Sequence, residues 1–103
     1  MSEQAAKGPD DAVLRHNEAY KRFEAQLGSE TAVASYMRVR DTYIFTHTEV
    51  PDAFEGRGIG SRLVRYALEH VKAEGRSVAP LCPFVKGYIE RHPEYKSLVK
   101  MGM

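Results

Sequence analysis

The stretch Phe54-Glu55-Gly56-Arg57-Gly58-Ile59-Gly60-Ser61 lies in the middle of this 103-residue chain, directly before an apolar repeat of helical period. Its three glycines stand at alternate positions. The absence of Cβ atoms there lets consecutive N–H groups turn toward one anion at the positive end of a helix dipole. The stretch therefore predicts a phosphate-binding loop, and a pyrophosphate is the anion that fits it best. The alternative is a tight turn whose glycines serve backbone geometry alone.

The residues after the loop predict an amphipathic helix. Its apolar positions recur every three or four residues, at Ile59, Leu63, Val64, Ala67, Leu68 and Val71. Gly75 is the stop signal expected just past a helix C-terminus. Before the loop, residues 41–50 are rich in β-branched and aromatic side chains and predict a strand. Along this strand Tyr43, Phe45 and His47 are expected to alternate with Ile44, Thr46 and Thr48 between the two faces.

Two common phosphate-binding fingerprints do not match the loop. A dinucleotide fingerprint has a third glycine where this chain has Ser61, and it has an acidic residue at the end of the next strand. Here the next predicted strand runs into Pro80-Leu81-Cys82 instead. A nucleoside-triphosphate loop has Gly-Lys-Ser/Thr at the start of the helix, and Gly60-Ser61 lacks the lysine.

Further segments complete the predicted secondary structure. Strands are expected at residues 13–17, 22–27, 31–39 and 77–81, with turns at residues 18–21 and 28–30. The strands before the loop are connected tightly enough to form an antiparallel meander. A short second helix is expected around Phe84, Tyr88 and Ile89, and Leu98 and Val99 are expected to anchor the tail.

Composition and charge limit the class of protein. A chain of this length forms one domain, which we expect at residues 12–103 behind a flexible polar arm at residues 1–11. Lys and Arg number 15 against 14 Asp and Glu, so the net charge of +1 gives no basic field for nucleic acid. The apolar runs are far shorter than the roughly twenty residues that cross a bilayer, and the first residues contain no apolar signal segment. We therefore expect a cytoplasmic protein without nucleic-acid or membrane partners.

Cys82 is the single cysteine of the chain. One thiol cannot form an internal disulfide. With few other ligands at metal-binding spacing near it, the sequence does not predict a structural zinc site, so no metal is expected. Its position before the second predicted helix, with Pro83 at the first helical position, favours a thiolate. The structural alternative is a small buried apolar residue.

The order of these elements resembles that of the GNAT N-acetyltransferase superfamily. The usual loop of that superfamily is Gln/Arg-x-x-Gly-x-Gly/Ala, and residues 55–60 keep its two defining glycines with Glu55 at the first position. More closely, the chain resembles very small GNAT-like proteins that share four motifs in order. Here these motifs read His47-Thr48-Glu49-Val50-Pro51, Cys82-Pro83-Phe84-Val85, Tyr88-Ile89 and His92-Pro93-Glu94-Tyr95, and the match spans residues 13–99.

This resemblance implies a compact mixed α/β (α+β) fold, with a mostly antiparallel mixed sheet, a central helix after the loop and a short C-terminal helix. It also implies that the protein binds acetyl-CoA and acts as an N-acetyltransferase on an unidentified amine. The pyrophosphate would lie on the backbone N–H groups of Gly56, Arg57, Gly58, Ile59, Gly60 and Ser61, and the pantetheine arm along Thr48 to Val50. The side chains of Arg57 and Arg62 are within reach of phosphate oxygens.

Acetyl transfer to an amine requires positioned reactants, a base for the amine and a proton for the leaving thiolate. In a direct route Glu49 or His47 acts as the base, and Tyr88 or Tyr95 donates to the sulfur. In a covalent route Cys82 takes the acetyl group first. The resemblance supports this candidate, because the cysteine of Cys-Pro-Phe lies near the cofactor thioester in the small GNAT-like proteins. His47 also fits a half-buried, hydrogen-bonded structural residue.

Two other functions remain open at this level. A non-catalytic acyl-CoA-binding or sensing module would bind the same ligand and act through a partner protein. A structural protein whose glycine loop is only a turn would have no affinity for CoA. The first alternative differs from the enzyme in turnover and the second in ligand binding.

Overall fold

The structure is a computed structural model that describes residues 12–54, 56 and 58–100. The elements in chain order are β1 (Val13–Asn17), β2 (Arg22–Leu27), β3 (Glu30–Val39), β4 (Thr42–Glu49), the 3₁₀ turn η3 (Asp52–Phe54), α1 (Ile59–Ala73), β5 (Ser77–Pro80), α2 (Pro83–Arg91) and the 3₁₀ segment η4 (Pro93–Leu98). Each predicted strand and helix is present; the bounds of β1 and β2 are as predicted, and the ends of β3, β4 and β5 differ by at most one residue. The arm predicted at residues 1–11 lies outside the described residues, as do Glu55 and Arg57.

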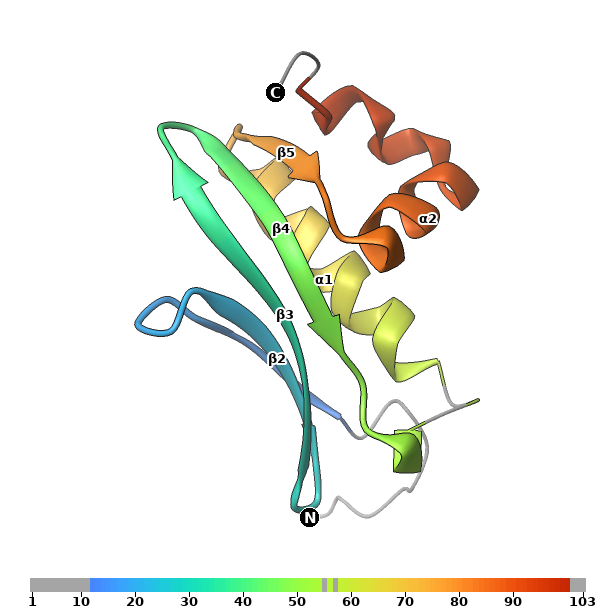
Figure 1. Ribbon diagram of the computed structural model, residues 1–103. Helices are drawn as coiled ribbons and strands as arrows, with labels where there is room; N and C mark the ends of the chain where they lie inside the picture. The colour runs from blue at the N-terminus through green and yellow to red at the C-terminus, as the bar shows by residue number, and fades with distance from the viewer. Residues whose placement is uncertain (1–11, 55, 57, 101–103) are drawn as a thin grey trace.

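The strands form one sheet in the order β1-β2-β3-β4-β5 (Figure 1). Strands β1 to β4 are each antiparallel to the next, because the connections between them are too short for a crossover. β5 pairs parallel to β4, since α1 carries the chain back along the sheet before β5 begins. The prediction of a mixed, mostly antiparallel sheet is confirmed.

Helix α1 begins and ends at glycines. Gly58 is its N-cap and has a φ of 74°, a left-handed conformation that residues with a Cβ rarely adopt. At the other end Gly75 has a φ of 70°. The N–H groups of Gly75 and Arg76 donate to the carbonyls of Lys72 and Val71 at 3.0 and 3.1 Å. These two bonds form a Schellman motif, so the predicted stop at Gly75 is confirmed.

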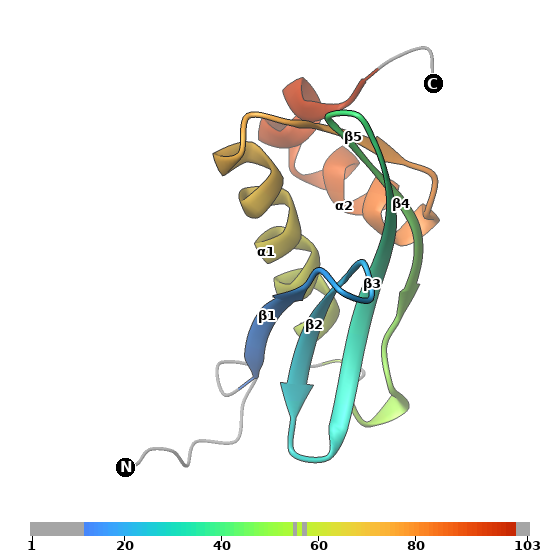
Figure 2. The same ribbon diagram turned by 90° about the vertical axis from the view of Figure 1, so that its left-hand side faces the viewer.

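The core lies between the sheet and α1, which covers one face of the sheet (Figure 2). The apolar stripe predicted for α1 is buried there, against side chains from β2, β3 and β4. The buried residues of this core are Phe23, Ala25, Ala32, Ala34, Tyr36, Tyr43 and Phe45 from the sheet, and Ile59, Leu63, Val64, Ala67, Leu68 and Val71 from α1. Across residues 12–54, 56 and 58–100, no helix has the length and apolar character to span a membrane.

A cluster of polar and aromatic side chains holds the C-terminal end of α1 against the sheet. The Tyr43 hydroxyl donates to Glu74 Oε1 at 2.7 Å, and His70 Nε2 donates to Glu74 Oε2 at 3.1 Å. His16 Nε2 and the Tyr36 hydroxyl are 2.6 Å apart and share a hydrogen bond. Burial, and then the Glu74 carboxylate, raise the pKa of Tyr43, so the phenol keeps its proton and remains a donor.

Strand β4 contains a bulge at Thr46. On β3, Tyr36 pairs with Phe45 and the preceding Ser35 pairs with His47, so Thr46 is an extra residue on β4. Residues directly opposite each other on antiparallel strands share a face of the sheet. The extra residue therefore reverses the faces of the β4 residues that follow it.

This bulge corrects the alternation expected for the strand. Phe45 is buried on the α1 side, and Thr48, which pairs with Ala34, lies on that same side. His47 lies on the opposite face and is exposed. The expected grouping of His47 with Tyr43 and Phe45 is therefore wrong, and so is the interpretation of His47 as a half-buried residue.

The face of the sheet away from α1 carries a buried carboxylate, Glu24 on β2, which is 1 % exposed. Its Oε1 accepts a hydrogen bond from Arg15 Nε at 2.5 Å, and its Oε2 accepts from Arg22 Nε at 2.6 Å and from the Asn17 amide at 3.1 Å. Burial alone would raise the pKa of Glu24. The three hydrogen bonds outweigh that effect and lower the pKa to about 2.

We expect Glu24→Gln to remove a pH-dependent part of the stability. The folded pKa of about 2 lies below the ordinary value of 4.5, so ionised Glu24 stabilises the folded state above pH 4.5, and this contribution is lost as the pH falls from 4.5 toward 2. At neutral pH the variant should lose about 1 to 3 kcal/mol of unfolding free energy, because hydrogen bonds to a charged group are lost. Urea unfolding of both proteins at neutral and acidic pH measures this difference, which should shrink in acid. A difference that is constant across that range would contradict the role given to Glu24.

Candidate functional site

The glycine loop and the first turn of α1 border a hollow of about 300 Å³. It is lined by Gly56, Gly58, Ile59, Gly60 and Ser61, with Val50, Phe54 and Phe84 as apolar walls. The first N–H groups of a helix have no partners within the helix and carry the positive end of its dipole. The hollow can therefore accept an anionic group that is joined to an apolar arm.

The three glycines of the loop are required for different reasons. Gly56 and Gly58 have φ values of 76° and 74°, and a Cβ at either position would meet no atom within 4 Å. These two positions need glycine because of their backbone conformation and not because of packing. The space in front of them is open to a ligand. At Gly60, by contrast, a Cβ would lie 2.8 Å from Phe84 Cζ and 3.2 Å from Val50 Cγ2. Gly60 lets the start of α1 approach the walls of the hollow.

Strand β4 extends beyond the end of β5. The parallel ladder between these strands ends at the pair formed by Phe45 and Pro80, so residues 46–49 lie past it. The chain leaves β5 for α2, which lies beside this part of β4 (Figure 1). Residues 46–49 lead to Val50 and thus into the wall of the hollow. This strand end is where the sequence resemblance puts the pantetheine arm.

Cys82 is the N-cap of α2 and lies against β4. Its N–H donates to the Phe45 carbonyl at 2.9 Å, and the residue is 4 % exposed. Its Sγ lies 3.2 Å from Thr48 Oγ1, where the hydroxyl and the sulfur form a hydrogen bond with either as the donor. The burial agrees with the structural interpretation of Cys82. The hydrogen bond to Thr48 is a polar contact that a purely apolar residue would not make.

The fold separates His47 and Glu49 from Cys82. By register both residues lie on the face of the sheet away from α1, and both are exposed. Thr48, between them, lies on the α1 side and bonds to Cys82. A base at position 47 or 49 would therefore act on a group that approaches over the open face of the sheet, and not on the Cys82 thiol.

Tyr88 is better suited than Tyr95 to donate a proton. Burial raises the pKa of Tyr88, so its hydroxyl holds its proton more firmly than a free phenol does, and its ring stacks on His92 with 4.1 Å between centroids. The Tyr95 hydroxyl donates to Glu69 Oε2 at 2.6 Å. Burial, followed by this hydrogen bond, raises the pKa of Tyr95 to about 12. The proton of Tyr95 is therefore held by Glu69.

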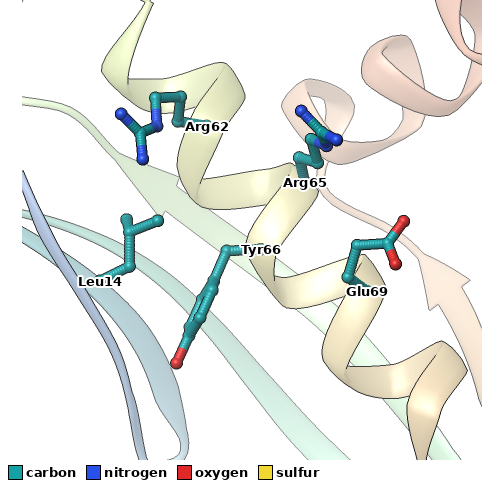
Figure 3. A pocket seen from close by; sticks show the side chains of 5 residues that line it. All are labelled: Leu14, Arg62, Arg65, Tyr66 and Glu69. Carbon is teal, nitrogen blue, oxygen red and sulfur yellow. The ribbon is translucent and has the colours of Figure 1, made fainter. Parts of the chain in front are cut away.

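A second depression, of about 260 Å³, lies beside α1 (Figure 3). Arg62, Arg65, Tyr66 and Glu69 line it from the helix, and Leu14 lines it from β1. Figure 3 shows the Tyr66 ring directed toward the strands and the Arg62 side chain on the same side of the helix as Leu14. Arg62, predicted to reach phosphate oxygens, thus borders this depression from the first turn of α1. Arg57, predicted for the same role, lies outside the described residues.

Sequence reasoning missed three features of the site. Phe54 and Phe84 wall the hollow, and both could have been noticed, because one begins the loop and the other belongs to the Cys-Pro-Phe motif. The bulge at Thr46 has no sequence signal, because no glycine or proline interrupts the strand. The bond between Thr48 and Cys82 joins residues 34 positions apart, so no local sequence pattern contains it.

Within the described part of the chain, no three His, Cys, Asp or Glu residues are grouped to hold a metal ion.

Comparison with known proteins agrees with this geometry. A family profile described as GCN5-related N-acetyl-transferase matches residues 22–98. Protein NATD1 of Xenopus tropicalis is 32 % identical over 83 residues, which cover 78 % of this chain and 76 % of that protein. Protein NATD1 of Homo sapiens is 31 % identical, with 78 % and 74 % covered. The NMR solution structure of a GCN5-like protein from Staphylococcus aureus aligns with a TM-score of 0.67 at 22 % identity, over 85 % of this chain and 87 % of that one.

The chain belongs to the GCN5-related N-acetyltransferase family, since the profile spans most of its length. The resemblance read from the sequence motifs is therefore confirmed. The solved neighbour shares the mixed α/β fold and, at its low identity, supports the fold alone. The family places the chain among acetyltransferases in general and names no acceptor.

We expect Gly60→Ala to weaken binding of CoA, the ligand that the family resemblance implies, while the protein stays folded. The new Cβ would push the Phe84 ring from its position, and the ring can move because Phe84 is 39 % exposed. Alanine is also about 1 kcal/mol better than glycine inside a helix, which offsets part of the strain. Overpacking of about 1 to 2 kcal/mol at the wall of the hollow would lower the affinity roughly ten-fold, measured by calorimetric titration with CoA.

Gly87→Ala in α2 is the matched control. It makes the same chemical change in a helix, and its Cβ would lie 3.5 Å from the Arg91 side chain, an ordinary contact. This variant should bind CoA as the wild type does. If Gly60→Ala also binds like the wild type, the contact between Gly60 and Phe84 does not shape the ligand site.

Proposed function

We propose that the protein binds acetyl-CoA in the hollow at the start of α1 and transfers the acetyl group to an unidentified amine. The observation that carries the proposal is the juxtaposition of an anion-binding helix start and a thiol along the end of β4. Phe84 walls the hollow, and Cys82 lies two residues before it with its sulfur on Thr48. Family membership supports acetyl transfer in general.

The hollow suits both the pyrophosphate and the pantetheine arm of CoA. The open space in front of Gly56 and Gly58, together with the dipole of α1, favours the pyrophosphate. The Ser61 hydroxyl, in the first turn, is a further donor toward phosphate oxygens. Val50 and Phe84 offer apolar surface to the pantetheine arm, which leads along β4 toward Cys82.

In the proposed covalent route the Cys82 thiolate attacks the acetyl carbonyl. A bond forms between Cys82 Sγ and the acetyl carbon, the bond from that carbon to the CoA sulfur breaks, and the leaving thiolate takes a proton, with Tyr88 as the candidate donor. The amine then attacks the acetyl group on Cys82 and the amide forms. One amine proton passes to solvent, from which Tyr88 is reprotonated, and Cys82 returns as a thiolate; His47 and Glu49, the bases predicted from the sequence, lie on the opposite face of the sheet and could serve only a direct route from that side.

Incubation with acetyl-CoA should add one acetyl group to the wild-type protein, seen as a mass increase of the intact chain. Hydroxylamine should remove the adduct because it cleaves thioesters. Since Cys82 is the single cysteine, a protein thioester can form nowhere else in this chain. Cys82→Ser should lose the hydroxylamine-sensitive adduct and most of its turnover. If Cys82→Ser keeps full turnover with a confirmed acceptor, transfer is direct and the covalent route is excluded.

A non-catalytic acyl-CoA-binding module is the second candidate function. The position of His47 and Glu49 favours it, because both candidate bases lie on the face of the sheet opposite to Thr48. Such a module would bind CoA without releasing free thiol in the presence of any amine. A screen of amines with acetyl-CoA, followed by thiol release, separates the two functions.

A further inference from the structure

We propose that Thr48 is a positioning residue for Cys82: its hydroxyl donates to the ionised sulfur and fixes the direction in which that sulfur points. The inference deepens the proposed covalent function and rests on it. Thr48 otherwise belongs to the residues expected along the pantetheine arm, a role that uses its backbone. The hydroxyl is free of that role and lies 3.2 Å from Cys82 Sγ.

A thiolate at this position needs a hydrogen-bond donor. Cys82 is 4 % exposed, so water has little access to its sulfur. A hydroxyl that donates to the sulfur replaces part of the missing solvation, and bonds to charged acceptors are stronger than neutral ones. Thr48 is itself half-buried, so its hydrogen bond is shielded from competing water.

The backbone N–H groups at the start of α2 do not form a hydrogen bond with the Cys82 sulfur. An N-cap side chain normally accepts from a backbone N–H in the first turn of its helix. Cys82 is the N-cap of α2, yet its side chain makes no capping hydrogen bond. Its N–H donates to Phe45 on β4 and its Sγ bonds to Thr48 on the same strand. The sulfur is therefore oriented by β4 rather than by the helix that follows it.

The bulge at Thr46 is what brings the hydroxyl to the sulfur. Under strict alternation from Phe45, His47 would lie on the α1 side of β4 and Thr48 on the open face. The extra residue reverses that order, so Thr48 faces Cys82 and His47 does not. The bulge thus selects which side chain of the His-Thr-Glu segment meets the thiol.

The test measures the ionisation of Cys82 without acetyl-CoA or acceptor. Ultraviolet absorbance of the thiolate is followed against pH, with Cys82→Ser subtracted to remove the tyrosine signal; this readout needs no reagent to enter a buried site. Thr48→Val keeps the shape and removes the donor, and it should move the ionisation midpoint about one pH unit higher, which is a ten-fold loss of thiolate below the midpoint. Thr48→Ser restores the hydroxyl and should return the midpoint close to that of the wild type.

A midpoint unchanged in Thr48→Val would overturn the proposal, even if acetyl transfer were lost. Thr48→Ala serves as a second donor-free variant, and circular dichroism reports whether each protein is folded. If Thr48→Val does not fold and Thr48→Ala does, the ionisation midpoint of Thr48→Ala must rise by the same amount. If the midpoint rises in Thr48→Val but the wild-type protein forms no acetyl adduct, the role of Thr48 is supported and the covalent function is contradicted. Failure of the Thr48 proposal can therefore be told apart from failure of the covalent function.

Discussion

The parallel pairing of β4 with β5 ends at Pro80, and the geometry of the candidate site depends on that ending. Proline has no N–H group to extend a ladder, so the chain leaves the sheet and starts α2. Residues 46–49 of β4 continue beyond it, beside the N-terminus of α2. A longer β5 would pair with this strand end and cover it.

The two helices begin near the same place. A missing Cβ at Gly60 lets the first turn of α1 approach Phe84, which lies in the first turn of α2. The positive ends of both helix dipoles therefore lie near the hollow, an arrangement that favours a bound pyrophosphate. The bulge in β4 adds a division between the faces of the sheet. Thr48 serves the side with the helices, while His47 and Glu49 share the open face with the hydrogen-bonded carboxylate of Glu24.

The elements could be predicted because several local signals agreed. The glycine loop at residues 56–60, the apolar stripe from Ile59 to Val71 and the stop at Gly75 all specify the same helix. The loop residues of the hollow were predictable for the same reason. The bulge was not, because Thr46 can sit in a regular strand as well as in a bulge, and only pairing with β3 decides between them. The contact of Thr48 with Cys82 depends on that pairing and on tertiary packing, so no local pattern contains it.

The most direct test of the account is a map of backbone amide shifts during titration with CoA, measured by NMR on the full chain. The account predicts that the largest changes fall on Gly58, Gly60, Ser61 and Val50, while Glu24 on the open face is unaffected. Changes concentrated on Arg65, Tyr66 and Glu69, around the second depression, would contradict it. So would an unchanged spectrum at about millimolar CoA, the range of the weakest specific binding.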